Sequence, residues 1–272
     1  MDAGTATLSL RPYRPRRFPD LVRVGSEFDG GYVLPLSAIR ASQALLSLGV
    51  EENWAFEQGV LALNPSIRLT CVDGTTGPEQ IRTKALRGML QALLRLRAGK
   101  FVRMARLLHR PRAFRQFFAR HEFLKLMVAG RSGPGAATLE ELLQRVRQGD
   151  AQRWVLVKMD IEGSEYDALA ACVGGLRRVA VLIVEFHALD RNWQRFAATM
   201  DALAGSFVIA HVHGNNYDGY VPGSHVPQTL EVTLVHRDLA AAAPPAASER
   251  YPLPDLDRPN NHRHPDLDLS FE

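Results

Sequence analysis

The chain lacks the features that mark disulfide-stabilised, membrane-spanning and secreted proteins. Its 272 residues include only two cysteines, Cys71 and Cys172, which are far apart and form no CxxC pair. We therefore expect buried free thiols rather than a disulfide framework, a redox motif or a zinc site. No apolar run reaches the roughly 18 residues typical of a membrane span. The first residues lack a basic segment followed by an apolar core, so we expect no secretory signal and a cytoplasmic protein.

Acidic residues are scarce in one part of the chain. Between Pro78 and Arg131 there are 14 Lys or Arg residues against only Glu79 and Glu122, although the whole chain has a net charge of +4. Apolar residues in this segment recur at helical spacing, which predicts an inserted basic helical cap at 78–131. Such a cap would suit an anionic acceptor, and a solvated Arg-rich face of amphipathic helices is the alternative. It carries no nucleic-acid recognition motif, so we do not expect a nucleic-acid partner.

Short apolar runs alternate with helical patterns along the rest of the chain, which predicts an α/β fold. Residues 28–35 are expected to form a tight Gly-Gly turn that leads into a short strand. The further expected strands are 44–50, 67–73, 123–128, 155–160, 179–186, 207–213 and 230–235. The expected helices are 53–63 with Asn53 as N-cap, 138–146 with a capping box at Thr138, 164–172 and 191–203. We expect the first 25 residues to be irregular and residues 214–219 to form a turn. The pattern predicts one open, mostly parallel sheet whose last two strands form an antiparallel hairpin.

The stretch from Val155 to Asp167 carries the strongest functional signal, with the sequence V-L-V-K-M-D-I-E-G-S-E-Y-D. A buried apolar strand ends there in acidic residues. A second apolar run, from Val179 onward, ends in Glu185 and His187. Because ligands of open α/β sheets bind at the carboxyl ends of the strands, these polar side chains predict a functional site.

These motifs resemble the FkbM family of S-adenosylmethionine-dependent methyltransferases. The residues that carry the resemblance are Lys158-Met-Asp-Ile-Glu-Gly-Ser-Glu165, Val184-Glu-Phe-His187, Asp29-Gly-Gly-Tyr32 and the segment 47–57. The resemblance runs from about Arg23 to Val235 apart from the basic insert. It implies a class I methyltransferase (Rossmann-like) fold with a seven-stranded sheet, here as one domain over 1–240. It also implies methylation of a hydroxyl on a sugar, glycan or other small polyhydroxylated acceptor.

The resemblance also implies a binding site for the methyl donor. The candidate donor-binding residues are Gly49, Val50, Glu57 and Asp73. Asp73 ends a strand, where an acid accepts hydrogen bonds from the ribose hydroxyls; an aspartate that only stabilises the following turn is the alternative. Gly49 would let the backbone approach the donor's amino-acid end, or it is an ordinary turn glycine. The family's glycine-rich loop after the first strand is reduced here to this one glycine.

Methyl transfer to a hydroxyl needs a base close to the acceptor oxygen. The candidates are Asp160, Glu162, His187 and His213, and core hydrogen bonding is the alternative for the histidines. A divalent cation, Mg²⁺ or Mn²⁺, held by Asp160, Glu185 and His187 is a second mechanism, because it would lower the pKa of the acceptor hydroxyl.

Further polar residues are candidates for binding the acceptor. They are Asp29, Glu185, Asn215, Asn216 and Asp257. The last of these belongs to a Pro-rich linker and tail, 241–272, which either packs on the surface or folds over the site as a lid. Lys158 lies within an apolar strand, and pairing with Glu185 is one hypothesis for its charge.

Two functions of other classes stay open from the sequence. One is a non-catalytic basic binding module for an anionic glycan or RNA, which the charge of the cap favours. The other is a metal-dependent hydrolase that uses the acidic residues and histidines. A homo-oligomer is equally compatible with the sequence.

Overall fold

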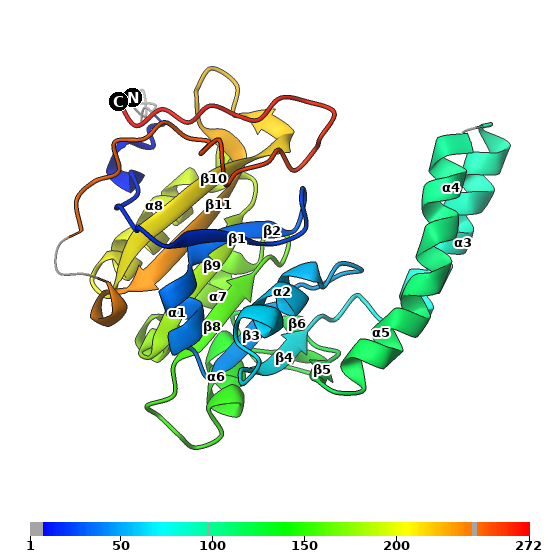
Figure 1. Cartoon of the computed structure of the whole chain (residues 1–272), viewed down its shortest axis with the longest axis horizontal. Coiled ribbons are helices and arrows are strands. Elements are labelled where there is room, and N and C mark those ends of the chain that lie inside the picture. Colours follow the sequence, from blue (N-terminus) through cyan, green and yellow to red (C-terminus); the bar gives the residue numbers. More distant parts are fainter. Residues whose placement is uncertain (1–7, 97, 241–243) are drawn as a thin grey trace.

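The computed structural model describes residues 8–96, 98–240 and 244–272. The expectation that residues 1–7 carry no secretory signal, and the expectation of a linker at 241–243, therefore lie outside the described residues. The chain is built around a seven-stranded sheet (Figure 1), with strand order β10-β11-β9-β8-β3-β4-β5. The strands are β3 (Ala44–Leu48), β4 (Arg68–Val72), β5 (Glu122–Leu124), β8 (Val155–Met159), β9 (Val179–Phe186), β10 (Phe207–Tyr220) and β11 (Pro227–His236).

The direction of the strands confirms the predicted fold class. Strands β5, β4, β3, β8 and β9 run parallel, whereas β11 is antiparallel to both β9 and β10. The sheet is thus a mostly parallel, Rossmann-like sheet with an antiparallel terminal hairpin. In an open sheet of this kind, the carboxyl ends of the parallel strands form a common edge where ligands bind.

Helices cover both faces of the sheet. The helices beside the sheet are α1 (Leu36–Ala41), α2 (Ala55–Leu63), α6 (Leu139–Arg147), α7 (Glu165–Ala170) and α8 (Leu189–Ala204). Strands β3, β8 and β9 are buried along their whole length. Because successive strand residues point to opposite faces, Leu46 and Val157 join the core under α6, α7 and α8, while Leu45 and Leu156 join the core under α1 and α2.

Short elements complete the body of the molecule. They are the paired strands β1 (Leu21–Gly25) and β2 (Gly31–Pro35), the paired strands β6 (Met127–Val128) and β7 (Ala136–Ala137), and the 3₁₀ turns η1 (Arg11–Tyr13), η3 (Val173–Leu176) and η4 (Arg237–Leu239). The strand β1 corrects the expectation that the first 25 residues are irregular.

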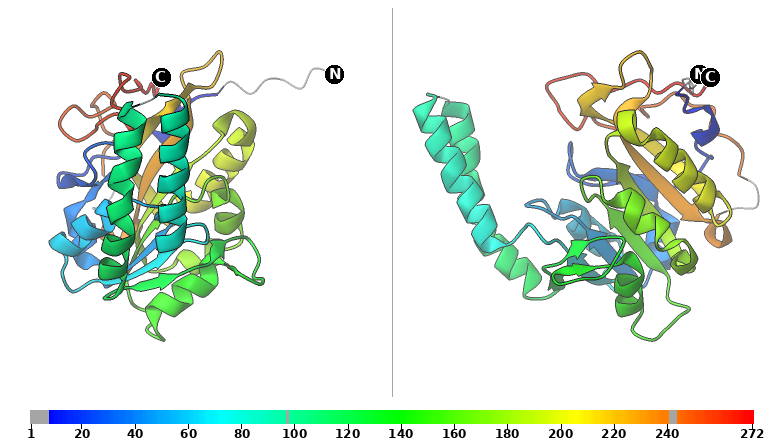
Figure 2. Two further views of the ribbon diagram at one scale, coloured as in Figure 1. Left: turned by 90° about the vertical axis from the view of Figure 1, so that its right-hand side faces the viewer. Right: turned by 180° about the vertical axis from the view of Figure 1, so that it is seen from behind.

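The basic segment forms a helical arm. Its helices are α3 (Pro78–Leu94), α4 (Ala98–Arg106), the 3₁₀ turn η2 (Leu107–His109) and α5 (Arg110–Phe118). Figures 1 and 2 show that α3 and α4 form a hairpin that stands out from the body. At its base, Phe114 of α5 packs against Trp54 and Phe123. Within the described residues, no helix has both the length and the apolar character needed to cross a bilayer.

Two local predictions were wrong. Residues 214–219 do not form a turn, because β10 continues through Tyr220 and pairs there with Pro227 of β11. Asn53 is not the N-cap of α2, since that position belongs to Trp54, although the Asn53 side chain accepts a hydrogen bond from the amide of Ala55. The capping box at Thr138 is confirmed.

The described part of the tail, 244–272, packs along β10, β11 and the β1–β2 hairpin. Asn260 donates to Glu231 of β11 and to Asp29, and the Asn261 amide donates to Asn216 of β10. Tyr251 and Leu269 join the apolar core. The tail is therefore an ordered layer at this side of the sheet.

Candidate functional site

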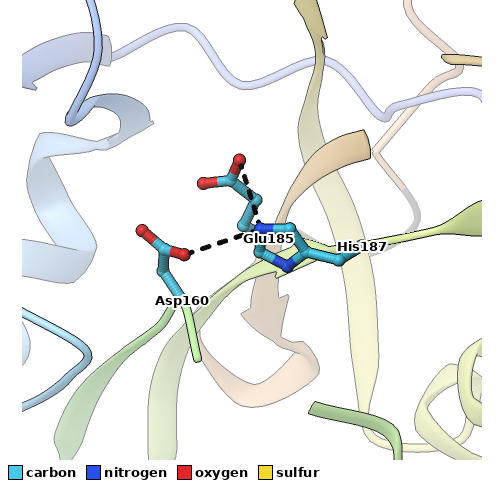
Figure 3. A group of neighbouring side chains, drawn as sticks. All are labelled: Asp160, Glu185 and His187. Carbon is cyan, nitrogen blue, oxygen red and sulfur yellow. Dashed lines mark ion pairs between the residues drawn. The ribbon is translucent and has the colours of Figure 1, made fainter. Parts of the chain in front are cut away.

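Three predicted site residues meet at the carboxyl ends of β8 and β9. Asp160 follows β8, Glu185 lies near the end of β9, and His187 follows that strand (Figure 3). The Nε2 atom of His187 lies 3.9 Å from a carboxylate oxygen of Asp160 and 3.9 Å from one of Glu185. One ligand atom from each of the three residues lies within 4.8 Å of the others. The spacing of the two strand-end motifs therefore brings together one imidazole and two carboxylates.

Glu162 joins this group from the following loop. Its Oε2 atom lies 3.8 Å from Nε2 of His187, but 76% of its side chain is exposed to solvent. An exposed carboxylate is screened by water, so Glu162 contributes less to the electrostatics of the site than Asp160 and Glu185 do.

Asp160 is held by two donors from other elements. Its Oδ2 atom accepts from the Tyr32 hydroxyl at 3.2 Å and from Nζ of Lys158 at 3.3 Å. Lys158 also donates to the carbonyl oxygen of Gly49 at 2.5 Å. The direct partner of Lys158 is thus Asp160, which corrects the hypothesis of a pair with Glu185. Because Tyr32 and Lys158 both bind Oδ2 of Asp160, the Oδ1 atom faces Nε2 of His187.

His187 is oriented by Glu165. The Nδ1 atom of His187 lies 2.8 Å from Oε1 of Glu165, which also accepts from the amides of Ile161 and Gly163. Burial alone would lower the pKa of His187, but the hydrogen bond to Glu165 and the charge of Glu185 outweigh it and raise the pKa to about 9. At neutral pH the imidazole is therefore protonated and compensates the charge of the carboxylates.

Glu185 differs from Asp160 in its surroundings. It is 5% exposed, and Asn215 of β10 donates to its Oε1 atom at 2.7 Å. Burial, reinforced by the charge of Asp160, raises the pKa of Glu185 well above its ordinary range. Burial and the neighbouring charge therefore favour the protonated form of Glu185.

The loop after β3 passes so close to Asp160 that only glycine fits. Gly49 has a φ of 72°, and a Cβ atom at this position would lie 1.6 Å from the carbonyl oxygen of Asp160. Gly49 is therefore needed for a close approach to the protein's own backbone. This approach places the loop 49–53 beside the site.

We expect Gly49→Ala to destabilise the protein strongly. The left-handed backbone alone costs about 1–2 kcal/mol for a residue with a Cβ atom, and the overlap with the Asp160 carbonyl adds to that cost. Gly135→Ala is a matched control, because Gly135 has a similar φ of 75° and open space around it. Denaturant unfolding of both variants checks the prediction, and equal losses of unfolding free energy would contradict the steric argument.

Asp73 fixes the same loop from the other side. One of its oxygens accepts from the amides of Val50 and Glu51, and the other accepts from the amides of Thr75 and Thr76 and from the Thr75 hydroxyl. Burial would raise the pKa of Asp73, but these hydrogen bonds outweigh it and lower the pKa. The geometry supports the turn role of Asp73, since its acceptor positions are already used.

Two adjoining cavities open at this edge of the sheet. We call the first the acid cleft; its lining includes Asp29, Gly30, Tyr32, Gly49, Val50, Glu51, Asn53, Phe56, Glu57, Lys158, Asp160, Glu162, Glu185, His187, Asn215, Tyr217, Asp218 and Thr229. We call the second the apolar slot; its lining includes Val72, Asp73, Gly74, Thr75, Leu126, Met127, Val128 and Ile161. Both cavities also share Gly49, Glu51, Asp160 and Glu162 as walls.

Glu57 lies in the wall of the acid cleft with a free acceptor. It extends from α2 toward Ser47 of β3, whose hydroxyl donates to Oε1 at 2.5 Å. The residue is 1% exposed, and its Oε2 atom has no hydrogen-bond partner among the described residues. Burial raises the pKa of Glu57. A buried acceptor without a partner in a cavity wall is suited to a ligand that brings a donor.

His213 does not reach the acid cleft. Its ring nitrogens lie 3.3 Å from Glu231 and 3.0 Å from Asp266 of the tail, and the residue is 2% exposed. Strand β11 lies between β9 and β10, so Glu231 separates His213 from Glu185. Because each strand adds about 5 Å, His213 is roughly 10 Å from Glu185. The structure thus contradicts its assignment as a base beside Asp160.

Two other candidates are occupied by contacts with the tail. Asn216 donates to the carbonyl oxygens of Asn261, His264 and Pro265. Asp257 pairs with His211 and accepts from the amide of Leu253. Neither is among the residues that line the acid cleft, so the expected acceptor contacts from Asn216 and Asp257 were wrong for the conformation that the structure describes.

Three residues of the site were not among the sequence candidates. Tyr32 and Lys158 hold Asp160, and Glu165 orients His187. All three stand inside the motifs that carry the family resemblance. Their position in those motifs is the sequence feature from which their role in the site could have been predicted.

A comparison with protein families finds one family model that is similar to the central part of the chain. Residues 119–217, just over a third of the sequence, match the family model described as the methyltransferase FkbM domain. This segment contains Asp160, Glu185, His187 and Asn215. No significant match was found among curated proteins.

Solved structures of methyltransferase-like proteins are similar at low identity. The Methanococcus jannaschii fibrillarin pre-rRNA processing protein matches with 8% identity and a TM-score of 0.37, over 81% of this chain and 84% of that chain. The precorrin-6y C5,15-methyltransferase from Geobacter metallireducens matches with 10% identity and a TM-score of 0.36, over 74% of this chain and 84% of that chain. The segment 119–217 that matches the methyltransferase FkbM domain contains both strand-end motifs on which the resemblance in the sequence rests.

Proposed function

We propose that the protein is an S-adenosylmethionine-dependent O-methyltransferase that acts on a hydroxyl of a neutral, polyhydroxylated small molecule, such as a sugar or glycan. One observation carries this proposal: the apolar slot adjoins and shares wall residues with an acid cleft that contains Asp160, Glu185 and His187. The apolar slot and the acidic walls match the chemistry of a nucleoside with a cationic tail. The polar side chains of the acid cleft match a hydroxyl-rich acceptor.

The residues at the junction of the two cavities fit the donor. The apolar side chains of Met127, Val128 and Ile161 would hold an adenine ring, and the acidic walls would compensate the positive sulfonium. The free Oε2 atom of Glu57 is an acceptor for the donor's ammonium group. Bound adenosylmethionine would supply a methyl group on a sulfonium. When an oxygen attacks the methyl carbon, the bond from carbon to sulfur would break and the rest of the donor would leave as a neutral thioether.

Asp160 is the residue that we assign as general base. It lies at the junction of the two cavities, and Lys158 and Tyr32 anchor one of its oxygens. Its other oxygen can accept the proton of an acceptor hydroxyl while the bond from oxygen to the methyl carbon forms. The protonated His187 and the Lys158 ammonium keep the site from accumulating uncompensated negative charge.

The walls of the acid cleft favour a neutral acceptor. Seven acidic residues line it, against Lys158 and His187 as basic residues. None of the described residues of the basic arm lines it, so the arm offers no support for an anionic acceptor in this cleft. Carboxylates and the amide of Asn215 are suitable partners for sugar hydroxyls.

A divalent cation at Asp160, Glu185 and His187 is the second mechanism that the geometry supports. Glu165 accepts from the other nitrogen of His187, which is the usual arrangement behind a metal-binding histidine. Bound Mg²⁺ or Mn²⁺ would lower the pKa of the acceptor hydroxyl. Because His187 must lose its proton to bind a metal, cation binding would release protons and strengthen as pH rises toward 9.

Calorimetric titration with S-adenosylhomocysteine tests the donor site. We expect EDTA-treated protein to bind this product with micromolar affinity, on the order of −8 kcal/mol. We expect Glu57→Gln to weaken binding while leaving thermal unfolding nearly unchanged. A repeat with Mg²⁺ separates the two mechanisms, since a cation-dependent change favours the second. The absence of binding in both states would instead favour the binding module or the hydrolase.

A further inference from the structure

The hairpin of α3 and α4 carries an exposed apolar stripe that the rest of the chain does not explain. Four leucines of α3 form it: Leu86, Leu90, Leu93 and Leu94. They recur at helical spacing, and three of them are more than half exposed, at 59% for Leu90, 62% for Leu93 and 76% for Leu94. At the tip of the hairpin, Leu96 is 92% exposed. Leucines at this exposure mark a surface that contacts something else.

The stripe lies on the side of α3 that is turned away from the packed face. The packed face consists of Ile81, Ala85, Gly88 and Ala92, which are buried. A Cβ atom at Gly88 would lie 2.5 Å from the sulfur of Met104, so α4 packs tightly there. At 100° per residue, Leu90 is opposite Ile81 on the helix. The apolar stripe therefore cannot be covered by α4.

Basic residues surround the stripe. Residues 78–118 contain eleven Lys or Arg and one acid, Glu79. On the helix, Arg82 and Arg87 flank the leucines on either side, and both are exposed. Long basic side chains can lie along an apolar surface while their charged ends reach outward to anions.

We propose that the α3–α4 hairpin docks on the surface of an anionic lipid bilayer. A bilayer surface offers apolar chains for the leucines and phosphate groups for the arginines in one plane, as amphipathic basic helices require. Two copies of the hairpin packed face to face would bring like charges together. A nucleic acid would pair with the arginines but leave the leucines in water. The hairpin projects from the body, so its stripe can reach a flat surface (Figure 2).

Flotation of the whole protein with lipid vesicles tests this proposal. We expect binding to vesicles that mix phosphatidylcholine and phosphatidylglycerol, and about tenfold weaker binding to phosphatidylcholine alone. The variant L93Q/L94Q should lose about tenfold in binding to the mixed vesicles, and so should R82Q/R87Q. Leu63→Gln is the control, because Leu63 is an exposed leucine on the body and should bind as the unchanged protein does.

Several results would overturn the proposal. Equal binding to both kinds of vesicle, or no binding to either, would remove the anionic bilayer as the partner. Light scattering that shows a dimer dissociated by L93Q/L94Q would assign the stripe to a second copy of the chain. Binding to single-stranded RNA that competes with the vesicles and ignores the leucine variants would assign the arginines to nucleic acid. Circular dichroism of each variant confirms that the exposed substitutions leave the fold intact.

Discussion

Asp160→Asn should lower the rate of methyl transfer by about 10²–10⁴-fold, the contribution typical of a positioned general base. The amide keeps the shape of the side chain and can still accept from Tyr32 and Lys158 through its oxygen. It cannot take the proton of the acceptor hydroxyl. We therefore expect the turnover rate to fall while the affinity for S-adenosylhomocysteine stays within a few-fold of the unchanged protein.

Asp167→Asn is the matched control for this substitution. Asp167 lies on α7, close in sequence to Asp160, and pairs with Arg195 at the surface, where its side chain is 66% exposed. Its variant should retain full activity, because exposed ion pairs contribute little. Full activity of Asp160→Asn would overturn the assignment of the base. Loss of product binding together with activity would instead place Asp160 among the donor contacts.

The parallel strands were predictable because their signal is local. Strands β3, β8 and β9 are buried on both faces, so each appears in the sequence as a continuous apolar run. Asp160 and His187 follow these runs directly, Glu185 lies near the end of β9, and parallel neighbours bring their carboxyl ends to one edge. That part of the site therefore follows from the sequence alone.

The antiparallel side of the sheet was not predictable in the same way. Residues 214–219 have the composition of a turn, yet β11 continues to pair with this part of β10 as far as Tyr220. The order of the last strands is not a local property either. A sequence pattern shows that His213 ends an expected strand, but not that β11 separates that strand from β9.

Long-range contacts decide the remaining roles. Tyr32 reaches Asp160 from 128 residues away, and the loop after Gly49 meets Asp160 through its backbone. Asp73 is at the strand end where a ribose contact is expected, but its oxygens accept from the turn beside it and from the Gly49 loop. No spacing rule distinguishes these two uses of one carboxylate.

His213→Ala should lower the free energy of unfolding by about 3–5 kcal/mol, because it leaves the buried Glu231 and the partly buried Asp266 without their cation. The ring nitrogens of His213 face Glu231 and Asp266, and both can donate only when the imidazole is protonated. His225→Ala, on the exposed loop of the same β10–β11 hairpin, is the control and should change stability little.

The pH dependence distinguishes this charged pair from ordinary packing. Burial alone would lower the pKa of His213, but the hydrogen bonds to Asp266 and Glu231 outweigh it and raise the pKa to about 10. Because the pKa is higher in the folded than in the unfolded protein, the stabilisation is complete below about pH 6.5 and is lost as pH rises through about 10. Unfolding free energies measured from pH 6 to pH 10 should fall for the unchanged protein and fall less steeply for His213→Ala. The slope that remains belongs to the other groups whose pKa values folding raises, among them His187, with a pKa of about 9, and Glu185. Identical slopes for both proteins would show that His213 is buried neutral and that no charged pair with Asp266 holds the tail.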